Sequence, residues 1–244
     1  MREAEYPNGI CEYCGFDPEQ YQMLPHHLEP TTILKGRYLL GTVLGEGGFG
    51  ITYIAFDLVL ERQVAIKELF IVGILTRERT NTVLVDPSLG GQQYYQECKD
   101  KFLQEARLLF TLGDKSGIVD IFDYFEENGT AYLVMEYLTG MDLLTYIKGK
   151  GGRISYEEAF HLLRPVMRSM ILVHRAGIIH RDIAPDNLRY VDDNYVKIMD
   201  FGSSKYNYSD YSSHIVLVKP GYAPREQYVK NYKVGPWKIG RAHV

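Results

Sequence analysis

The chain has 244 residues, of which 45% are hydrophobic and 24% are charged, so it is long enough to form one sizeable core or two small ones. This composition excludes a disordered tail, a collagen-like fibre and a small disulfide-stabilised protein. The 27 basic and 31 acidic residues give a formal net charge of −4, which favours neither nucleic acid nor an anionic membrane surface as a partner.

The start of the chain contains no sustained hydrophobic periodicity, and we interpret residues 1–36 as a leader ahead of the globular part. Its one local feature is Cys11-x-x-Cys14, which supplies half of a Zn²⁺ site. The other ligands would have to come from His26 or His27, which are adjacent, or from another chain. A turn that carries two thiols is the alternative interpretation.

The sequence shows no sign of export or of a membrane anchor. No charged and apolar signal follows Met1, so we expect the cysteines to stay reduced in the cytoplasm. The most apolar stretches, such as 131–138 and 166–173, are far shorter than the roughly 20 residues that a membrane-spanning helix requires. We therefore expect a cytoplasmic chain without a membrane segment.

Runs of β-branched and aromatic residues predict a small antiparallel sheet at the start of the globular part. The strands are predicted at 37–44, 51–60, 61–70, 118–125 and 130–137. Residues 76–93 are rich in Asn, Asp, Pro and Gly and are predicted to form a loop insertion. The apolar spacing over 95–112 marks one helical face, and this helix would complete a first lobe.

A second, helical lobe is predicted to begin at Ser155. Ser155 and Glu158 have the spacing of a capping box, in which each side chain satisfies a free backbone N–H group of the other residue. Apolar residues then recur at helical spacing up to Gly177, a residue type that commonly ends helices.

A glycine-rich turn separates the first two predicted strands. The segment Leu44–Gly50 contains the pattern G-x-G-x-x-G, in which glycines let backbone N–H groups approach phosphates. A flexible hairpin is the alternative interpretation, but a strand, and not a helix, is predicted to follow at 51–56. That context favours a flap that covers phosphates over a dinucleotide-binding fold.

Four residues downstream have the order and chemistry that phosphoryl transfer from ATP requires. Lys67 ends the apolar run Val-Ala-Ile-Lys, although a lysine in a strand is also typical of a solvated edge. Asp182 lies in Ile-His-Arg-Asp, and Asn187 follows it by five residues. Asp200 opens Asp-Phe-Gly after a short predicted strand. One aspartate can orient a hydroxyl, while the asparagine and the other aspartate can hold divalent cations.

Together these motifs resemble the protein kinase family, in the form of bacterial kinases of the eukaryotic serine/threonine type. The resemblance covers about 37–237 and implies a two-lobed α+β fold. The N-lobe, at 37–138, would combine an antiparallel sheet with one helix. The C-lobe, at 139–237, would be mainly helical and incomplete. The resemblance also implies ATP and Mg²⁺ as cofactors and a protein hydroxyl as the acceptor.

The resemblance implies an ATP site built from the glycine-rich turn, the strand that ends at Lys67 and the link between the lobes. Lys67 would pair with the α- and β-phosphates and be held by Glu105, with Glu97 as the other candidate. The gatekeeper and the adenine-binding backbone would lie within 135–138. The implied ATP-binding residues are Leu44, Gly45, Glu46, Gly47, Gly48, Phe49, Gly50, Thr52, Ala65, Lys67, Met135, Glu136 and Leu138.

Asp182 is implied as the catalytic base, and Asn187 and Asp200 as the Mg²⁺ ligands. Arg181 is typical of kinases whose activation segment is ordered by phosphorylation, because a guanidinium can pair with a phosphate. Ordinary polar loop residues are the alternative for each candidate phosphosite. These candidates are Ser203, Ser204, Ser209, Ser212 and Ser213.

Two positions depart from the family pattern in the predicted C-lobe. Ala184 stands where serine/threonine kinases usually carry a lysine that contacts the γ-phosphate. Our hypothesis is that Lys219, at a position where the family usually has a threonine facing the catalytic aspartate, restores that charge and acts in catalysis. Arg189 replaces an apolar residue beneath adenine, where its methylene stem could still pack.

The C-terminal region departs furthest from the family. Kinases continue past the Ala-Pro-Glu region, here 223–226, into several helices. Residues 238–244 match the translation of a sequencing-library adapter, so we expect the natural reading frame to end near Trp237. Without the later helices, apolar surface of the second lobe would be exposed, so we expect the fragment to be poorly stable and little active. Two rival functions stay open. A pseudokinase or nucleotide-binding scaffold is favoured by Ala184 and Arg189, and a small-molecule phosphotransferase is disfavoured by Arg181.

Overall fold

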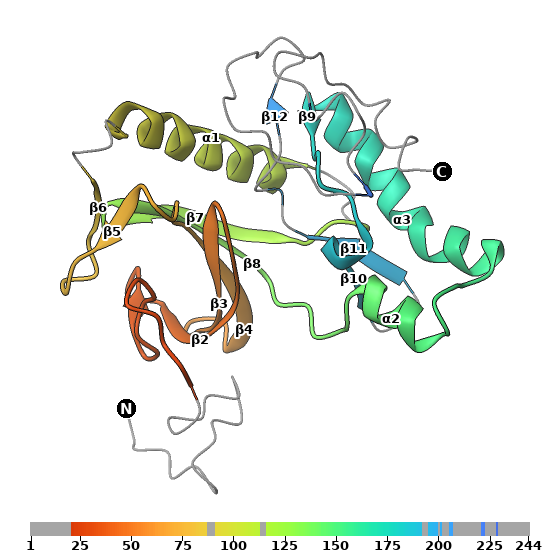
Figure 1. Cartoon of the computed structure of the whole chain (residues 1–244), viewed down its shortest axis with the longest axis horizontal. Coiled ribbons are helices and arrows are strands. Elements are labelled where there is room, and N and C mark those ends of the chain that lie inside the picture. Colours follow the sequence, from red (N-terminus) through yellow and green to blue (C-terminus); the bar gives the residue numbers. More distant parts are fainter. Residues whose placement is uncertain are drawn as a thin grey trace, which may run out of the picture. The chain divides into compact units, whose positions relative to one another are not determined.

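The computed structural model describes residues 21–86, 91–112, 116–191, 195–199, 201, 205–206, 221–222 and 228 (Figure 1). The chain divides into two compact units. The first comprises Met1–Phe110 and Ile121–Tyr137, and the second comprises Thr111–Asp120 and Leu138–Val244.

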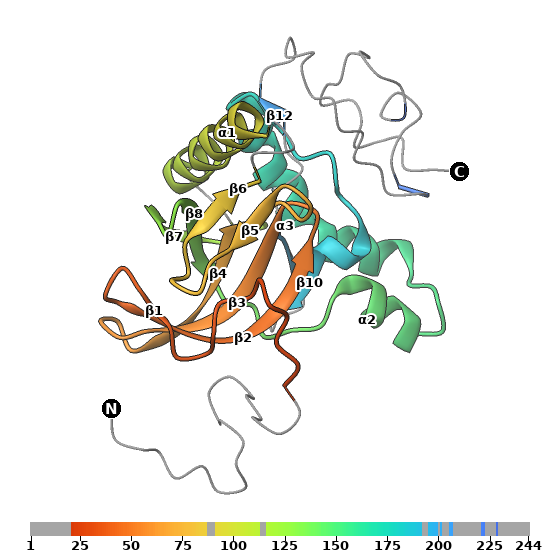
Figure 2. The same ribbon diagram turned by 60° about the vertical axis from the view of Figure 1, so that its left-hand side comes forward.

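The first unit is built on a six-stranded antiparallel sheet in the order β1-β2-β3-β4-β8-β7 (Figure 2). The bounds are β1 (Ile33–Leu34), β2 (Tyr38–Gly47), β3 (Gly50–Asp57), β4 (Arg62–Leu69), β7 (Ile121–Glu127) and β8 (Thr130–Glu136). The strands predicted from the β-branched and aromatic runs are thereby confirmed. Strand β1 was not predicted, because two residues are too few to show a pattern.

Residues ahead of the predicted boundary at 36/37 also belong to the core of this unit. The side chains of Leu28 and Leu34 are buried in the same apolar cluster as Tyr53. The Leu28 N–H donates a hydrogen bond to the Tyr53 hydroxyl at 3.1 Å, and the Leu40 N–H donates to the Thr32 carbonyl at 2.8 Å. The end of the predicted leader is therefore fastened to the edge of the sheet.

The turn between β3 and β4 is organised by the buried side chain of Asp57. Its carboxylate accepts the N–H groups of Val59 and Leu60, at 3.0 and 3.2 Å. It also accepts two hydrogen bonds from the Arg37 guanidinium, at 2.8 and 2.7 Å. These hydrogen bonds, first among them those of Arg37, hold the pKa of the Asp57 carboxyl below its usual value. Asp57 thus joins the start of β2 to the end of β3.

We predict that Asp57→Asn lowers the free energy of unfolding by about 2 kcal/mol at pH 7, because the amide keeps the shape of the carboxylate but loses its charge. A carboxyl whose pKa is lowered by folding stabilises the protein above its unfolded pKa, and this contribution is lost as the pH falls through the folded pKa. Denaturant unfolding from pH 7 down to pH 2 should therefore show a constant difference between the two proteins to about pH 4 and convergence below it. Glu61→Gln, an exposed carboxylate of the same turn, is the control.

The prediction that residues 76–93 form an irregular loop is wrong in part. This stretch contains most of an antiparallel hairpin of β5 (Leu75–Arg77) and β6 (Val83–Val85), with Asn81 at φ +68° in the turn. The strands have three residues each, which is too short for alternation to stand out among polar neighbours.

The predicted helix of the first unit is present as α1 (Gln92–Thr111). Its buried residues are Tyr95, Ala106 and Leu109. Tyr95 anchors the first turns, because its side chain lies in the core cluster and its hydroxyl donates to the Gly129 carbonyl at 2.8 Å. Phe110, one of the apolar residues in the spacing that predicts this helix, is about half exposed.

The second unit contains α2 (Leu143–Gly149) and the predicted long helix α3 (Tyr156–Arg175). Ser155 caps α3 as predicted, because its hydroxyl accepts the Glu158 N–H at 3.1 Å. The Glu158 carboxylate does not complete the box but accepts the Tyr146 hydroxyl of α2 at 2.6 Å, which lowers the pKa of Glu158. Gly177, at φ +79°, follows the last turn as expected.

Short elements complete the described part of the second unit. They are β9 (Ile178–Ile179), the 3₁₀ helix η2 (Pro185–Asn187), β10 (Leu188–Val191), β11 (Tyr195–Ile198) and β12 (Lys205–Tyr206). Strand β10 pairs with β11, and β9 pairs with β12, both antiparallel. None of the helices in the described residues combines the length and apolar character needed to span a membrane.

Candidate active site

The glycine-rich turn joins β2 to β3, as predicted, and its last backbone pair is Gly47 with Gly50. A Cβ atom added at Gly50 would lie 2.6 Å from the Glu68 carbonyl oxygen and 3.2 Å from the Lys67 Cε, so only glycine fits there. Cβ atoms added at Gly45, Gly47 and Gly48 would have no described atom within 4 Å. The turn is therefore held against β4 at Gly50 and has open space beside its backbone at Gly45, Gly47 and Gly48.

Lys67 lies in the middle of the sheet, on β4, with its side chain mostly buried. It pairs with Thr52 on β3 and with Leu133 on β8. The register also places Ala65 beside Met135, so these predicted ATP-site residues occupy neighbouring strands. A lysine at this position is central in its sheet and does not fit the alternative of a solvated edge.

The predicted partners of Lys67 lie on α1. Glu105 is in the second half of the helix, and Glu97 is in the first half, where it accepts the Gln93 amide at 3.3 Å on an exposed face. The ion pair of Lys67 with Glu105 stays a prediction.

The residues predicted to bind adenine lie at and after the end of β8. Met135 is buried, Glu136 is the last residue of the strand, and Leu138 is buried two residues beyond it. Their roles as gatekeeper and adenine-binding backbone stay predictions, as does that of Leu44, which is exposed on β2.

The Asp182 and Asn187 side chains meet in the second unit. The Asn187 Nδ2 donates to the Asp182 Oδ2 and to the Asp182 backbone carbonyl, both at 2.8 Å. These contacts fix the asparagine amide with its N–H groups toward Asp182, so the Oδ1 is the atom left to bind a cation. Arg181, immediately before Asp182, has φ +66°, a backbone conformation that is strained for a residue other than glycine.

A buried histidine supports this loop from behind. The His180 Nδ1 accepts the Asp182 N–H at 3.3 Å, which leaves the Nε2 to donate to the Met199 carbonyl at 3.1 Å. Its ring packs edge-on against Phe201, with 4.5 Å between ring centres. His180 therefore links the Asp182 loop to the segment that leads to Asp200. The resemblance to the kinase family implies packing, and not catalysis, for His180 and Phe201, and the ring contact agrees with that.

Ala184 and Arg189, which depart from the family pattern, lie in the described part of the second unit. Ala184 is buried and directly precedes η2. Arg189 lies on β10 and forms an isolated antiparallel bridge with Asp142. Partial burial raises the pKa of Asp142, but hydrogen bonds from Thr145 oppose this and the pKa is lowered overall.

Several predicted site residues lie outside the described residues, and their roles stay predictions. They are Asp200, Lys219, Cys11, Cys14, Ser203, Ser204, Ser209, Ser212 and Ser213. The predicted segments 223–226 and 238–244 lie outside them too.

Comparison with known proteins settles the family. The family model described as the protein kinase domain matches residues 38–237, which is most of the chain. The chain belongs to the protein kinase family. A solved kinase-fold chain described as "PpkA-294 apo form" has 31% sequence identity and a TM-score of 0.71, with 88% of this chain and 74% of that chain covered. The predicted two-lobed kinase fold is thereby confirmed.

The kinase domain is similar to bacterial serine/threonine-protein kinases. It is 35% identical to PknA of Mycobacterium tuberculosis over 70% of this chain, and 33% identical to PrkC of Bacillus subtilis over 69%. It is 31% identical to the probable kinase CA_C1728 of Clostridium acetobutylicum over 71%. The chain spans 36%, 23% and 23% of the lengths of these relatives, respectively.

Proposed function

We propose that this chain is the catalytic domain of a serine/threonine protein kinase, which transfers the γ-phosphoryl group of ATP to a hydroxyl of a protein substrate in the cytoplasm. The observation that carries the proposal is the pairing of Asp182 with Asn187, because it orients one carboxylate and one amide oxygen at adjacent positions. The names of the relatives support the class of reaction.

The donor set suits ATP with Mg²⁺. Carboxylate and amide oxygens are the ligands that Mg²⁺ prefers, and Asn187 and Asp200 would supply them. The open backbone at Gly45, Gly47 and Gly48 would lie over the phosphates. When bound, Mg²⁺ neutralises charge on the phosphate oxygens.

The protein residues would then divide the work as follows. Lys67, held by Glu105, positions the α- and β-phosphates. The Asp182 carboxylate orients the acceptor hydroxyl and takes its proton, while Asn187 keeps that carboxylate in one rotamer. Lys219 would supply the cation that Ala184 lacks, close to the charge that develops on the transferred group.

The test is an assay of the full-length protein, since little activity is expected of the fragment alone, with radiolabelled ATP, Mg²⁺ and a generic protein substrate, followed by phosphoamino-acid analysis. We expect label on serine and threonine, and none when Mg²⁺ is removed. The second candidate, a nucleotide-binding scaffold, is favoured by the buried Ala184. Binding of a fluorescent ATP analogue without any transfer of label would support the scaffold and contradict our proposal.

A further inference from the structure

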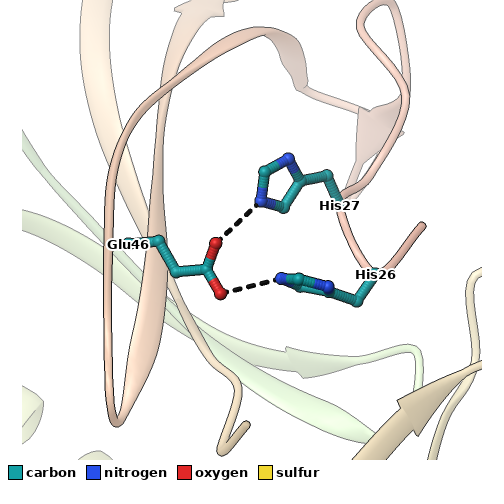
Figure 3. A group of neighbouring side chains, drawn as sticks. All are labelled: His26, His27 and Glu46. Atoms are coloured by element: carbon teal, nitrogen blue, oxygen red, sulfur yellow. Dashed lines mark hydrogen bonds and ion pairs between the residues drawn. The ribbon is translucent and has the colours of Figure 1, made fainter. Parts of the chain in front are cut away.

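Two adjacent histidines ahead of β1 hold the one carboxylate of the glycine-rich turn. The His26 Nε2 lies 2.7 Å from the Glu46 Oε1, and the His27 Nε2 lies 3.0 Å from the Glu46 Oε2 (Figure 3). Figure 3 shows the two rings approaching the carboxylate from the same side, one to each oxygen. We call His26, His27 and Glu46 the clasp. It joins residues 19 and 20 positions apart in the sequence.

The histidine side of the clasp is fixed to the core of the first unit. The Arg77 Nε donates to the His26 carbonyl at 2.7 Å, and the His26 ring stacks on Phe70 with 5.3 Å between ring centres. The His27 side chain is almost fully buried, and the next residue, Leu28, is in the core cluster. The two imidazoles are therefore a rigid support, not a mobile tail.

The glutamate side is otherwise weakly held. Glu46 pairs with Ile51 and lies between Gly45 and Gly47, where an added Cβ atom would have no described atom within 4 Å. The β2–β3 register shifts just before it, between Val43 and Gly45. Glycines give a backbone more freedom than any other residue, so the turn needs an external contact to adopt one position. The clasp is such a contact, and it acts on the residue between Gly45 and Gly47.

The hydrogen bonds of His27 show that a proton on its Nε2 joins the ring to the Glu46 carboxylate. The His27 Nδ1 accepts the Leu24 N–H at 3.3 Å, so the Nε2 carries the proton and donates it to Glu46. A metal ion at the Nε2 would move that proton to the Nδ1, where it would face the Leu24 N–H. Partial burial raises the pKa of Glu46, but the hydrogen bonds from His27 and His26 outweigh it and the pKa is lowered, as expected for a carboxylate that accepts two N–H groups.

We propose that His26 and His27 are positioning residues of the kinase domain, which hold the glycine-rich turn over the ATP phosphates through Glu46. The inference rests on the proposed function, since it takes the turn to cover phosphates. The clasp restricts the turn to fewer conformations before ATP binds. Less conformational entropy is then lost when the backbone N–H groups bind the phosphates, so the clasp favours triphosphate binding. Adenosine, which has no phosphates, gains nothing from it.

The test compares ATP and adenosine binding to the full chain and to clasp variants by calorimetry. Glu46→Ala opens the clasp from the turn, and the double variant His26→Leu, His27→Leu opens it from the support. We expect each to weaken ATP binding about tenfold and leave adenosine binding unchanged. The double variant His26→Gln, His27→Gln, whose amides can still donate, should recover most of the affinity. Glu29→Gln, on the same segment and exposed, is the matched control.

Hydrogen exchange of the turn gives a second readout that does not need nucleotide. Amides of residues 45–50 should exchange faster in Glu46→Ala while those of β4 stay protected. Unchanged exchange, or an equal loss of ATP and adenosine binding, contradicts the clasp. If the wild-type chain binds no ATP but the exchange result holds, then the proposed function fails and the clasp does not. Faster exchange of the turn on adding EDTA in the absence of nucleotide, reversed by Zn²⁺, would overturn the direct hydrogen bonds in favour of a metal site.

Discussion

Asp182→Asn lowers phosphoryl transfer at least about 1000-fold and leaves ATP binding unchanged, if Asp182 accepts the proton of the acceptor hydroxyl. The asparagine is isosteric, and its Oδ1 can still accept the Asn187 amide at the position now taken by the carboxylate. The loop therefore keeps its shape, and only the basic group is lost.

The measurement is initial-rate transfer of label from ATP to a protein substrate, beside the dissociation constant for ATP. Glu157→Gln, which removes an exposed carboxylate from the same unit, serves as the control and should retain wild-type turnover. Residual activity above a tenth of wild type in Asp182→Asn would show that another group takes the proton. A parallel loss of ATP affinity would mean that the loop, and not the chemistry, was damaged.

Arg77→Met lowers the free energy of unfolding of the first unit by about 3–5 kcal/mol, the largest stability effect that we expect. The Arg77 guanidinium lies 2.6 Å from the Glu68 Oε2, and the Glu68 carboxylate is fully buried. Attraction by Glu68 outweighs the effect of burial and raises the pKa of Arg77. Without the arginine, a negative charge stays in the core, and its remaining donors among the described residues are the hydroxyls of Tyr53 and Tyr132.

A double variant separates charge from packing. In Glu68→Gln, Arg77→Met, the buried group is neutral and the tyrosine hydroxyls keep an acceptor, so the loss should be smaller than in Arg77→Met alone. Unfolding by guanidinium chloride, followed by far-ultraviolet circular dichroism, gives the free energies of unfolding. Equal losses in the two proteins would show that the ion pair contributes little and that Arg77 acts through its hydrogen bonds to the His26 and Asn81 carbonyls and its contact with the Phe70 ring.

The parts of the site that sequence could predict are those in which the chemistry lies within a few residues. Asp182 and Asn187 are five positions apart and meet through their own short loop. The glycine-rich turn needs only two neighbouring strands, and Lys67 follows from the run that precedes it. For these residues local spacing determines contact, and the motif alone is informative.

The parts that sequence could not predict depend on contacts between distant segments. Leu28 is a single apolar residue in a polar stretch, and nothing in its neighbours indicates burial. Glu68 follows Lys67 in a strand, yet its partner Arg77 comes from an insertion that was predicted to be irregular. The partners of Glu46 were considered only as zinc ligands. Each of these contacts is tertiary, and tertiary contacts override local pattern.

The fastening of residues 24–34 to the sheet has a practical consequence for anyone who trims this domain. The family match begins at residue 38, which invites an expression boundary there. Such a cut would remove Leu28 from the core and would remove the His26 carbonyl, which accepts the Arg77 Nε–H. It would also expose the edge of β2 that pairs with β1. A strand edge laid bare in this way is prone to pair with other chains. An expression boundary at or before residue 21 keeps these contacts.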